Sequence, residues 1–314
     1  MAAIAVTGAS GFIGRRLIER LCRDGIPVRA LMRKRRVEVD IDGGDLTIIE
    51  GALGDDVAIA DLIDGVEGVI HLAGLIKART RQAFFDANEL GTRHLAAIAA
   101  AQPRPPKLVL VSSLAAREPA LSSYAASKRA GEDALLTLDN ALPWTILRPP
   151  AIYGPGDRET LAFFKSVSRG VGAMLGDDRA RFSLLHVDDL VELVLTVLAP
   201  SMADRLILEP DDGREGGHSW CGMIAAAERA SGKTVIRLRV PKMLLLALGH
   251  ANASLSILPG YIPMLTPEKV RELTHPNWVA DNRPIQSATG WKPTISVDRG
   301  FPATIDWYRL HSWL

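Results

Sequence analysis

The sequence has few cysteines, no strong excess of one charge and no long uninterrupted apolar run. Its two cysteines, Cys22 and Cys221, are too few for a disulfide framework, so a reducing compartment is the simpler expectation. The 37 basic and 36 acidic residues nearly cancel, which gives no overall electrostatic case for nucleic acid or an acidic membrane. No basic and apolar leader precedes the first strand-like run, so no secretory signal is expected and the cytoplasm is the expected location.

Apolar runs of strand length alternate with amphipathic runs of helix length through the first half of the chain. Strands are predicted at residues 4–6, 28–32, 46–49, 68–72, 108–111 and 144–147. Helices are predicted between them, near residues 12–23, 56–63, 82–101 and 122–139. This alternation predicts an α/β fold with a doubly wound parallel sheet that is covered on both faces. Ligands of such sheets bind beyond the carboxyl ends of the strands.

The second half alternates less regularly, and proline, glycine and turn residues become frequent there. Strands are expected at residues 182–187, 206–208 and 235–240, and helices at 188–198, 220–230 and 297–310. At 314 residues the chain exceeds the usual domain size, and its 47% apolar content allows a sizeable core. One large domain or two closely joined domains are therefore expected, and the sequence has no internal repeat.

A glycine-rich turn directly follows the first strand. Gly8, Gly11 and Gly14 lie between residues 4–6 and the helical run that begins at Phe12. Small residues let a backbone approach a pyrophosphate, whose charge then lies at the positive N-terminus of the helix. Three glycines alone are weak evidence, because any tight strand-to-helix turn favours them. The residues expected to contact a dinucleotide in this turn are Gly8, Ser10, Gly11, Phe12, Ile13 and Gly14.

Tyr124 and Lys128 lie four residues apart on a predicted helix, and two serines end the preceding strand. At this spacing the two side chains share one helix face. An ammonium group beside a phenol lowers the phenol pKa, so that Tyr124 can exchange a proton with an alcohol or a ketone. One of these serines, Ser112 or Ser113, would hydrogen-bond the substrate oxygen. A tyrosine and a lysine on an ordinary surface helix are the competing interpretation.

Together these residues resemble the short-chain dehydrogenase/reductase superfamily, in its extended branch of NAD-dependent epimerases and dehydratases. Further similarity lies at residues 69–74, 88–92, 148–156, 186–190 and 290–293. The resemblance implies a Rossmann-type dinucleotide domain at residues 1–150, to which 182–200 returns, and a smaller substrate-binding lobe at 151–314. It also implies that Ser113, Tyr124 and Lys128 are catalytic, whereas Asn88 is expected to be structural. Cofactor contacts are further implied for Leu53, Ala73, Gly74, Tyr124, Lys128 and Pro149.

The predicted second strand ends in a basic run, at residues 33–36. Relatives that prefer NAD place an acidic residue there to bind the ribose hydroxyls, and none is present. Arg33 could instead bind a 2′-phosphate through charge-assisted hydrogen bonds, which favours NADP(H) over NAD(H). A solvated basic loop is the alternative. No metal ion is expected at the site.

Several departures argue against a sugar-nucleotide substrate. Sugar-nucleotide relatives place an arginine four residues before the histidine of their HVxDL motif, but here that position is Phe182, and Arg181 stands five before His186. Along a strand, a shift of one residue turns a side chain to the other face, although a bulge could restore it. Arg179 is a second candidate cation. Residues 148–151 lack an asparagine, and the acid/base pair of the dehydratases is replaced by residues 114–115, Leu-Ala.

Residues 243–249 and 255–265 are unusually apolar. Three interpretations compete, which are core packing, a pocket for a hydrophobic ketone or alcohol, and an interfacial membrane contact. Core packing is the first expectation. The region is too short and too interrupted by His250, Asn252 and prolines to span a bilayer. With the departures above, it makes the chain more similar to hydroxysteroid dehydrogenases and dihydroflavonol reductases than to the sugar enzymes.

The leading hypothesis is an NADP(H)-dependent oxidoreductase that acts on an alcohol or ketone of a small or lipophilic substrate. A sugar-nucleotide epimerase or dehydratase is the second hypothesis, and a non-catalytic NADPH-binding structural or regulatory protein is the third. The resemblance also implies a homodimer, which would form through the helices near residues 82–101 and 122–139. No nucleic acid partner is expected.

Overall fold

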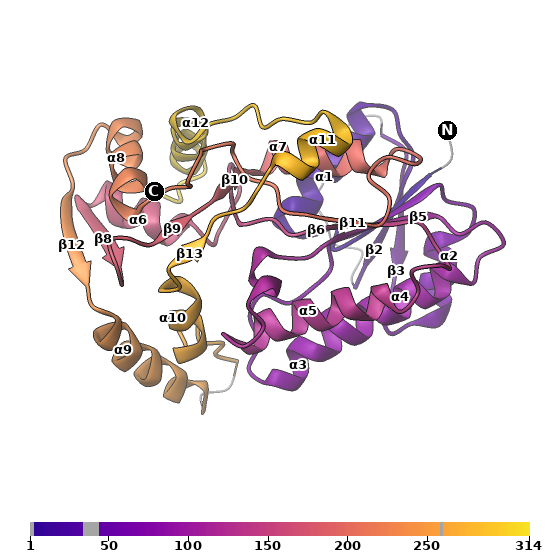
Figure 1. Ribbon diagram of the computed structural model, residues 1–314, viewed down its shortest axis with the longest axis horizontal. Coiled ribbons are helices and arrows are strands. Elements are labelled where there is room, and N and C mark those ends of the chain that lie inside the picture. Colours follow the sequence, from indigo (N-terminus) through magenta and orange to yellow (C-terminus); the bar gives the residue numbers. More distant parts are fainter. Residues whose placement is uncertain (1–2, 34–43, 258–259) are drawn as a thin grey trace. The chain divides into compact units, whose positions relative to one another are not determined.

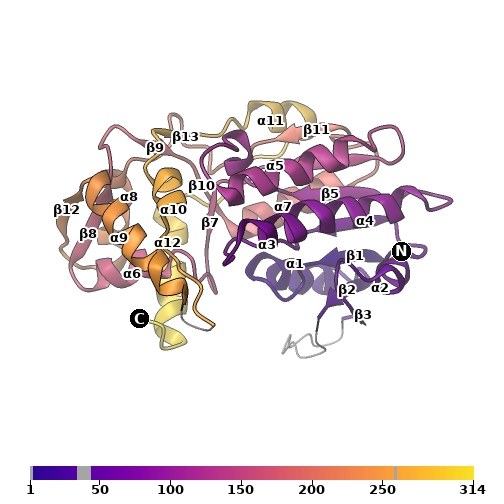
Figure 2. The same cartoon turned by 90° about the horizontal axis from the view of Figure 1, so that it is seen from below.

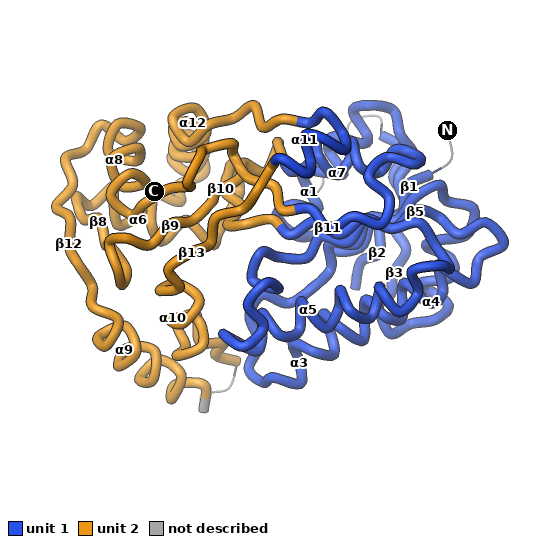
Figure 3. The backbone as a smooth tube through the Cα atoms, viewed as in Figure 1, with its two compact units in different colours: residues 1–148, 190–208, 283–291 blue, residues 149–189, 209–282, 292–314 orange. Residues whose placement is uncertain are grey.

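The structure, a computed structural model, describes residues 3–33, 44–257 and 260–314. The chain divides into two compact units, coloured separately in Figure 3. Unit 1 comprises Met1–Arg148, Leu190–Leu208 and Arg283–Trp291. Unit 2 comprises Pro149–Asp189, Glu209–Asn282 and Lys292–Leu314.

Unit 1 is built on a seven-stranded sheet in the order β3-β2-β1-β4-β5-β6-β11 (Figure 1). Every neighbouring pair is parallel, so the carboxyl ends of all strands meet at one edge. This arrangement confirms the predicted Rossmann-type fold. The strands are β1 Ile4–Thr7, β2 Val28–Met32, β3 Leu46–Glu50, β4 Gly68–His71, β5 Lys107–Val111, β6 Trp144–Leu147 and β11 Leu206–Leu208.

Helices cover the sheet of unit 1, and their apolar stripes explain why they form there. Leu17, Ile18 and Leu21 of one helix are fully buried, as are Ile59 and Leu62 of another. The helices α4 and α5 lie side by side (Figure 2). The helices are α1 Phe12–Arg23, α2 Asp56–Ile63, α3 Arg81–Phe85, α4 Gly91–Ala100, α5 Ser123–Leu136, α7 Val187–Leu198 and α11 Arg283–Thr289, with short turns η1 Asp86–Leu90 and η2 Leu114–Arg117.

The helix predicted over residues 82–101 is interrupted by η1, a single π-helical turn. The interruption follows from packing against α5, where Gly131 faces the backbone of Asn88. A Cβ atom at Gly131 would lie 2.2 Å from the carbonyl oxygen of Asn88. The wide turn therefore fits against α5 only because residue 131 has no side chain. Such π turns are frequent at functional sites.

Unit 2 holds three two-stranded sheets and an aromatic core. The rings of Tyr153 and Phe164 each meet Phe301 edge to face, with centroids 5.1 Å apart. The strand predicted over residues 182–187 is instead two short strands, because it is interrupted at Ser183, whose hydroxyl donates a hydrogen bond to Asp211. The strands are β7 Ala151–Tyr153, β8 Val171–Leu175, β9 Arg181–Phe182, β10 Leu184–His186, β12 Ile236–Val240 and β13 Asn277–Trp278.

The expectation that the apolar residues 243–249 and 255–265 of unit 2 form core is wrong, because many of their side chains are exposed. The helices of this unit are α6 Leu161–Ser168, α8 Trp220–Ser231, α9 Lys242–Ser254, α10 Pro267–Leu273 and α12 Val297–Leu310, with a short turn η3 Leu255–Ile257. In α9 only Leu245 and Gly249 are buried. Core packing was expected because apolar runs are usually buried, but one face of α9 is not buried by any part of the described chain. None of the described helices combines the length and the hydropathy that a bilayer crossing needs.

Candidate active site

The glycine turn between β1 and α1 is pressed against the end of β4. Gly8 has a φ of +73°, and a Cβ atom there would lie 2.6 Å from the backbone nitrogen of Ala73. A Cβ atom at Gly14 would lie 2.3 Å from the carbonyl oxygen of Gly8. Both positions therefore exclude a side chain. The turn is a tight backbone loop at the carboxyl edge of the sheet.

The N-terminus of α1 can accept a phosphate group. Its N-cap is Gly11, which offers no capping side chain, and the first turn contains no acidic residue. Ser10 and Gly11 are exposed, whereas Phe12 and Ile13 are half-buried and Gly14 is buried. The first N–H groups of a twelve-residue helix thus lie beside a loop of small residues, Gly8 to Gly11, which fits the pyrophosphate of a dinucleotide.

A buried chain of hydrogen bonds links this turn to α4, and the sequence analysis missed it. Thr7 Oγ1 lies 2.6 Å from His71 Nδ1, and His71 Nε2 lies 3.0 Å from Thr92 Oγ1. Thr92 donates to the carbonyl oxygen of Asn88, so it accepts from His71, which makes Nε2 the protonated nitrogen. Burial, with the charge of Lys128 acting in the same direction, lowers the pKa of His71 to about 3. His71 is therefore neutral and connects Thr7 to Thr92 through hydrogen bonds.

The two serines after β5 have different partners. Ser113 is the N-cap of η2, and its Oγ accepts a hydrogen bond from Ala115 N at 3.2 Å. Ser112 is buried and donates to Glu132 Oε1 at 2.5 Å. The hydroxyl of Ser112 is thereby committed to a carboxylate inside the unit. Ser113 is half-buried at the carboxyl edge of the sheet.

Tyr124 and Lys128 are carried on one face of α5. Ser122 caps this helix, because its Oγ accepts a hydrogen bond from Ala125 N at 3.0 Å. The Tyr124 ring packs against Phe84, with centroids 6.1 Å apart. A hydrogen bond from Arg129 to the carbonyl oxygen of Ala116, 3.0 Å long, ties α5 to η2, the turn that Ser113 caps.

Lys128 reaches the ends of two strands. Its Nζ donates to the carbonyl oxygen of Val111, the last residue of β5, at 3.0 Å. A Cβ atom at Gly74, just beyond β4, would lie 3.7 Å from the same Nζ. Burial lowers the pKa of Lys128 to about 8, although the negative charge of Glu132 opposes this shift. The amine is thus placed at the edge of the sheet where the glycine turn lies.

Asn88 links the loop after β4 to α5 through hydrogen bonds of its side-chain amide. Its Oδ1 accepts from Leu75 N at 2.8 Å, and its Nδ2 donates to the carbonyl oxygen of Leu75 and to Ser127 Oγ. A Cβ atom at Gly74 would lie 2.7 Å from Asn88 Oδ1. The asparagine therefore fixes the loop after β4 against α5.

Glu132 is a second residue that the sequence analysis missed. It is fully buried on α5, one turn after Lys128, and it forms a forked ion pair with Arg148 at the end of β6. The signal was available, because Tyr124, Lys128 and Glu132 follow one another at four-residue intervals on one helix face. No sequence pattern, however, distinguishes such a buried acid from an exposed one.

Three residues expected to contact the cofactor, Arg33, Leu53 and Pro149, lie on other segments of the chain than the catalytic candidates. Arg33 is exposed directly after β2, and the basic residues 34–36 lie outside the described residues. Leu53 packs toward α4, since a Cβ atom at Gly91 would lie 2.7 Å from its Cδ1. Pro149 is the first residue of unit 2.

The candidate cations for a substrate diphosphate belong to unit 2. Arg181 is exposed, and its guanidinium donates to the carbonyl oxygens of Asp178, Arg179 and Ala180. Phe182, at the position where sugar-nucleotide relatives have arginine, packs on the Trp220 ring with centroids 4.9 Å apart. Arg181 is therefore engaged by its own turn.

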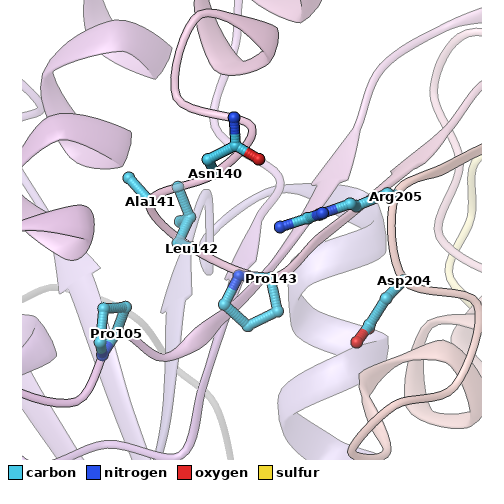
Figure 4. A pocket seen from close by; sticks show the side chains of 7 residues that line it. All are labelled: Pro105, Asn140, Ala141, Leu142, Pro143, Asp204 and Arg205. Carbon is cyan, nitrogen blue, oxygen red and sulfur yellow. The ribbon is translucent and has the colours of Figure 1, made fainter.

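A hollow of unit 1 has a volume of about 460 Å³. Figure 4 shows it from close by. Its lining includes Asn140, Pro143 and Arg205, which precede β6 and β11. It therefore lies at the amino ends of the strands, opposite the edge that carries Ser113 and the glycine turn. Among the described residues, no group of three or more acidic, histidine or cysteine side chains could hold a metal ion.

Comparison with known proteins identifies relatives along the whole chain. A family model described as the NAD dependent epimerase/dehydratase family matches residues 4–205. A ceramide reductase of Caulobacter vibrioides is 38% identical over 312 residues, which cover 99% of this chain and 96% of that protein. Sterol demethylase protein B of Methylococcus capsulatus is 27% identical, with 97% of each chain covered.

Solved structures share the fold. The UDP-glucuronic acid 4-epimerase of Bacillus cereus, solved with NAD, superimposes with a TM-score of 0.77 over 98% of this chain and 99% of that one. The two are 18% identical, so this likeness concerns the fold alone.

Proposed function

Since this chain belongs to the NAD dependent epimerase/dehydratase family, we propose that it is an NADP(H)-dependent reductase for the carbonyl group of a long-chain lipid of the ceramide kind. The chain is an NAD(P)-dependent enzyme of this family, whose members similar to it are named as reductases and epimerases. The observation that carries the proposal is the similarity to a ceramide reductase along nearly the full length of both chains.

We assign the chemistry to three residues of unit 1. When held over the glycine turn and beside Lys128, a reduced nicotinamide would supply the hydride that the carbonyl carbon needs. Tyr124 gives its phenolic proton to the carbonyl oxygen, and the ammonium group of Lys128 stabilises the phenolate that remains. Ser113 donates a hydrogen bond to the same oxygen and stabilises its developing negative charge. The product is an alcohol, and the phenol is restored by a proton from solvent.

The preference for NADP(H) is supported by the end of β2. Arg33 is exposed one residue beyond Met32, and no acidic residue stands there to bind the ribose hydroxyls. A guanidinium group binds a 2′-phosphate through paired hydrogen bonds. The proposal assigns unit 1, with Leu53, Ala73 and Gly74, to the cofactor and unit 2, from Pro149 on, mainly to the substrate.

A lipid substrate is supported over a sugar nucleotide by unit 2. The guanidinium of Arg181 is engaged by three carbonyl oxygens, and Phe182 packs on an aromatic ring. Neither feature serves a diphosphate.

We also propose a cytoplasmic location, with which two free cysteines in a reducing compartment agree, and a homodimer through α4 and α5. Arg93 and Ala97, one turn apart, are exposed on α4 and would take part in that contact.

The test is a coupled measurement of substrate and cofactor. Purified protein is incubated with NADPH and a ceramide analogue that carries a ketone, and both NADPH consumption and alcohol formation are followed. One alcohol should form for each NADPH consumed, and Tyr124→Phe should lose this activity while still binding NADPH. Interconversion of a sugar nucleotide without net NADPH consumption would instead identify an epimerase. Unchanged activity in Tyr124→Phe would refute the assigned chemistry.

A further inference from the structure

Residues 232–267 of unit 2 combine positive charge with exposed apolar surface. The segment contains four basic residues and no aspartate or glutamate, although the whole chain is nearly balanced in charge. Among the described residues, 14 large hydrophobic side chains are exposed, and eight of them belong to this segment. These eight are Ile236, Leu238, Met243, Leu244, Leu248, Leu255, Ile262 and Met264.

The helix α9 carries the centre of this surface. Leu245 and Gly249 are its buried residues, and Gly249 lies against the start of α10, with a Cβ atom there 3.1 Å from Thr266 C. Outside this contact, Met243 is 77% exposed, Leu244 51% and Leu248 49%. We call Met243, Leu244, Leu248 and Leu255 the α9 face. A helix that is apolar on all sides is normally buried, so this face requires a partner.

A second exposed segment is held next to the α9 face. Asn252 of α9 donates to the carbonyl oxygen of Leu265 at 2.9 Å, and Tyr261 donates to Asn252 Oδ1 at 2.5 Å. These bonds keep the segment that bears Ile262 and Met264 along the last turns of the helix. Ile262 is 43% exposed and Met264 53% exposed. The apolar surface is therefore contributed by two adjacent pieces of chain.

The charges beside the α9 face are positive. Arg237 and Arg239 on β12 pair with Glu228 and Asp178. Lys242, the first residue of α9, is exposed and forms no ion pair with a described residue. Anionic headgroups attract such a lysine, whereas a second copy of this basic surface would repel it.

We propose that the α9 face is a membrane-docking surface, which inserts its apolar side chains between the headgroups of an anionic bilayer while Lys242 binds a lipid phosphate. The helix has 13 residues, and a span needs about 20, so it lies in the plane of the interface. The surface is independent of the catalytic residues of unit 1. It goes beyond the proposed function, but a lipid substrate would be drawn from the bilayer that it contacts.

The experiment is vesicle flotation with the full chain and without cofactor or substrate. Vesicles of phosphatidylcholine alone are compared with vesicles that also contain one quarter phosphatidylglycerol. The chain should float with the anionic vesicles and at least tenfold less with the neutral ones. The triple variant Met243→Ser, Leu244→Ser, Leu248→Ser should lose binding at least tenfold, and Lys242→Glu should weaken the preference for anionic lipid.

The matched control replaces exposed apolar residues elsewhere. Val57 and Leu310 are 71% and 80% exposed, and the double variant Val57→Ser, Leu310→Ser should bind as the parent does. Far-ultraviolet circular dichroism checks that every variant is folded. Equal flotation of the parent and the triple variant overturns the proposal. So does a parent that self-associates through the α9 face but ignores vesicles. Because no turnover is measured, failure of the proposed reductase activity leaves this result unaffected.

Discussion

Arg148 and Glu132 form a forked ion pair inside unit 1, in which Nη2 lies 2.6 Å from Oε2 and Nε lies 3.0 Å from Oε1. The side chains are 11% and 1% exposed. The same carboxylate accepts the hydrogen bond of Ser112, at the end of β5, and its charge opposes the lowering of the Lys128 pKa. One buried acid therefore joins two strand ends to the helix that bears Tyr124.

Substitution of Glu132 by glutamine should destabilise the chain strongly. The change leaves the guanidinium of Arg148 buried without its counter-charge, which costs about 3 kcal/mol. It should also lower the pKa of Lys128 further, because the opposing negative charge is removed. Urea unfolding monitored by circular dichroism measures the free energy. The neighbouring pair of Arg129 and Asp133 is exposed, so Asp133→Asn should cost less than about 0.5 kcal/mol. Equal losses in both variants would contradict the buried-pair argument.

The amine of Lys128 should make stability rise with pH above neutrality. Its pKa is about 8 in the folded chain and about 10.4 when unfolded, so between these values the unfolded chain binds more protons. The burial cost is therefore complete below pH 8 and disappears toward pH 10.4. Lys128→Met should stabilise the cofactor-free chain at pH 7, by on the order of 1–3 kcal/mol, and this gain should shrink at higher pH. Lys233→Met, at an exposed position, serves as the control. A gain that does not vary with pH would refute the assignment.

The glycine turn offers a pair of substitutions that separates backbone strain from close approach. Gly8 and Gly25 have φ values of +73° and +69°, but a Cβ atom meets the backbone of Ala73 at Gly8 and nothing within 4 Å at Gly25. Gly25→Ala should cost only the left-handed penalty of about 1–2 kcal/mol. Gly8→Ala should cost more and should raise the Kd for NADPH at least tenfold, because the turn must move away from β4. Thermal unfolding and fluorescence titration measure the two effects, and equal behaviour of the two variants would argue against a cofactor turn.

His71 should make the chain sensitive to acid. Its pKa is about 3 when folded and about 6.5 when unfolded, so below pH 6.5 the unfolded state binds the extra proton. The stability that this difference represents is lost as pH falls from 6.5 toward 3, about 2 kcal/mol by pH 5. His71→Gln should show a flatter decline of the unfolding free energy over this range. The exposed His250→Gln should decline as the parent does. A parallel pH dependence of the parent and His71→Gln would exclude His71 as the cause.

The helices and strands of unit 1 could be predicted from local sequence, but the buried hydrogen bonds and the ion pair of the site could not. Strands β2 and β6 and helix α2 begin and end at their predicted residues, because a buried parallel strand and a capped amphipathic helix are both local patterns. The π turn at Asn88 depends on Gly131, which is 43 positions away. The bonds of His71 and the pair of Glu132 with Arg148 likewise depend on which strand ends become neighbours. Spacing could place Tyr124 and Lys128 on one helix face, but it could not tell that Ser112 turns to a buried acid.

The two serines after β5 should separate catalysis from stability. Ser113→Ala removes one donor to the developing oxyanion, so it should lower kcat about 10²-fold. It also removes one capping hydrogen bond, so the free energy of unfolding should fall by about 1 kcal/mol at most. Ser112→Ala removes a bond to a buried carboxylate, which should cost about 1.5–3 kcal/mol with kcat changed less than about tenfold. Steady-state kinetics and urea unfolding on both variants measure this contrast. If Ser112→Ala proved to be the variant that loses turnover, the oxyanion partner would be Ser112, because only the residue that touches the substrate oxygen can affect the rate without a matching loss of stability.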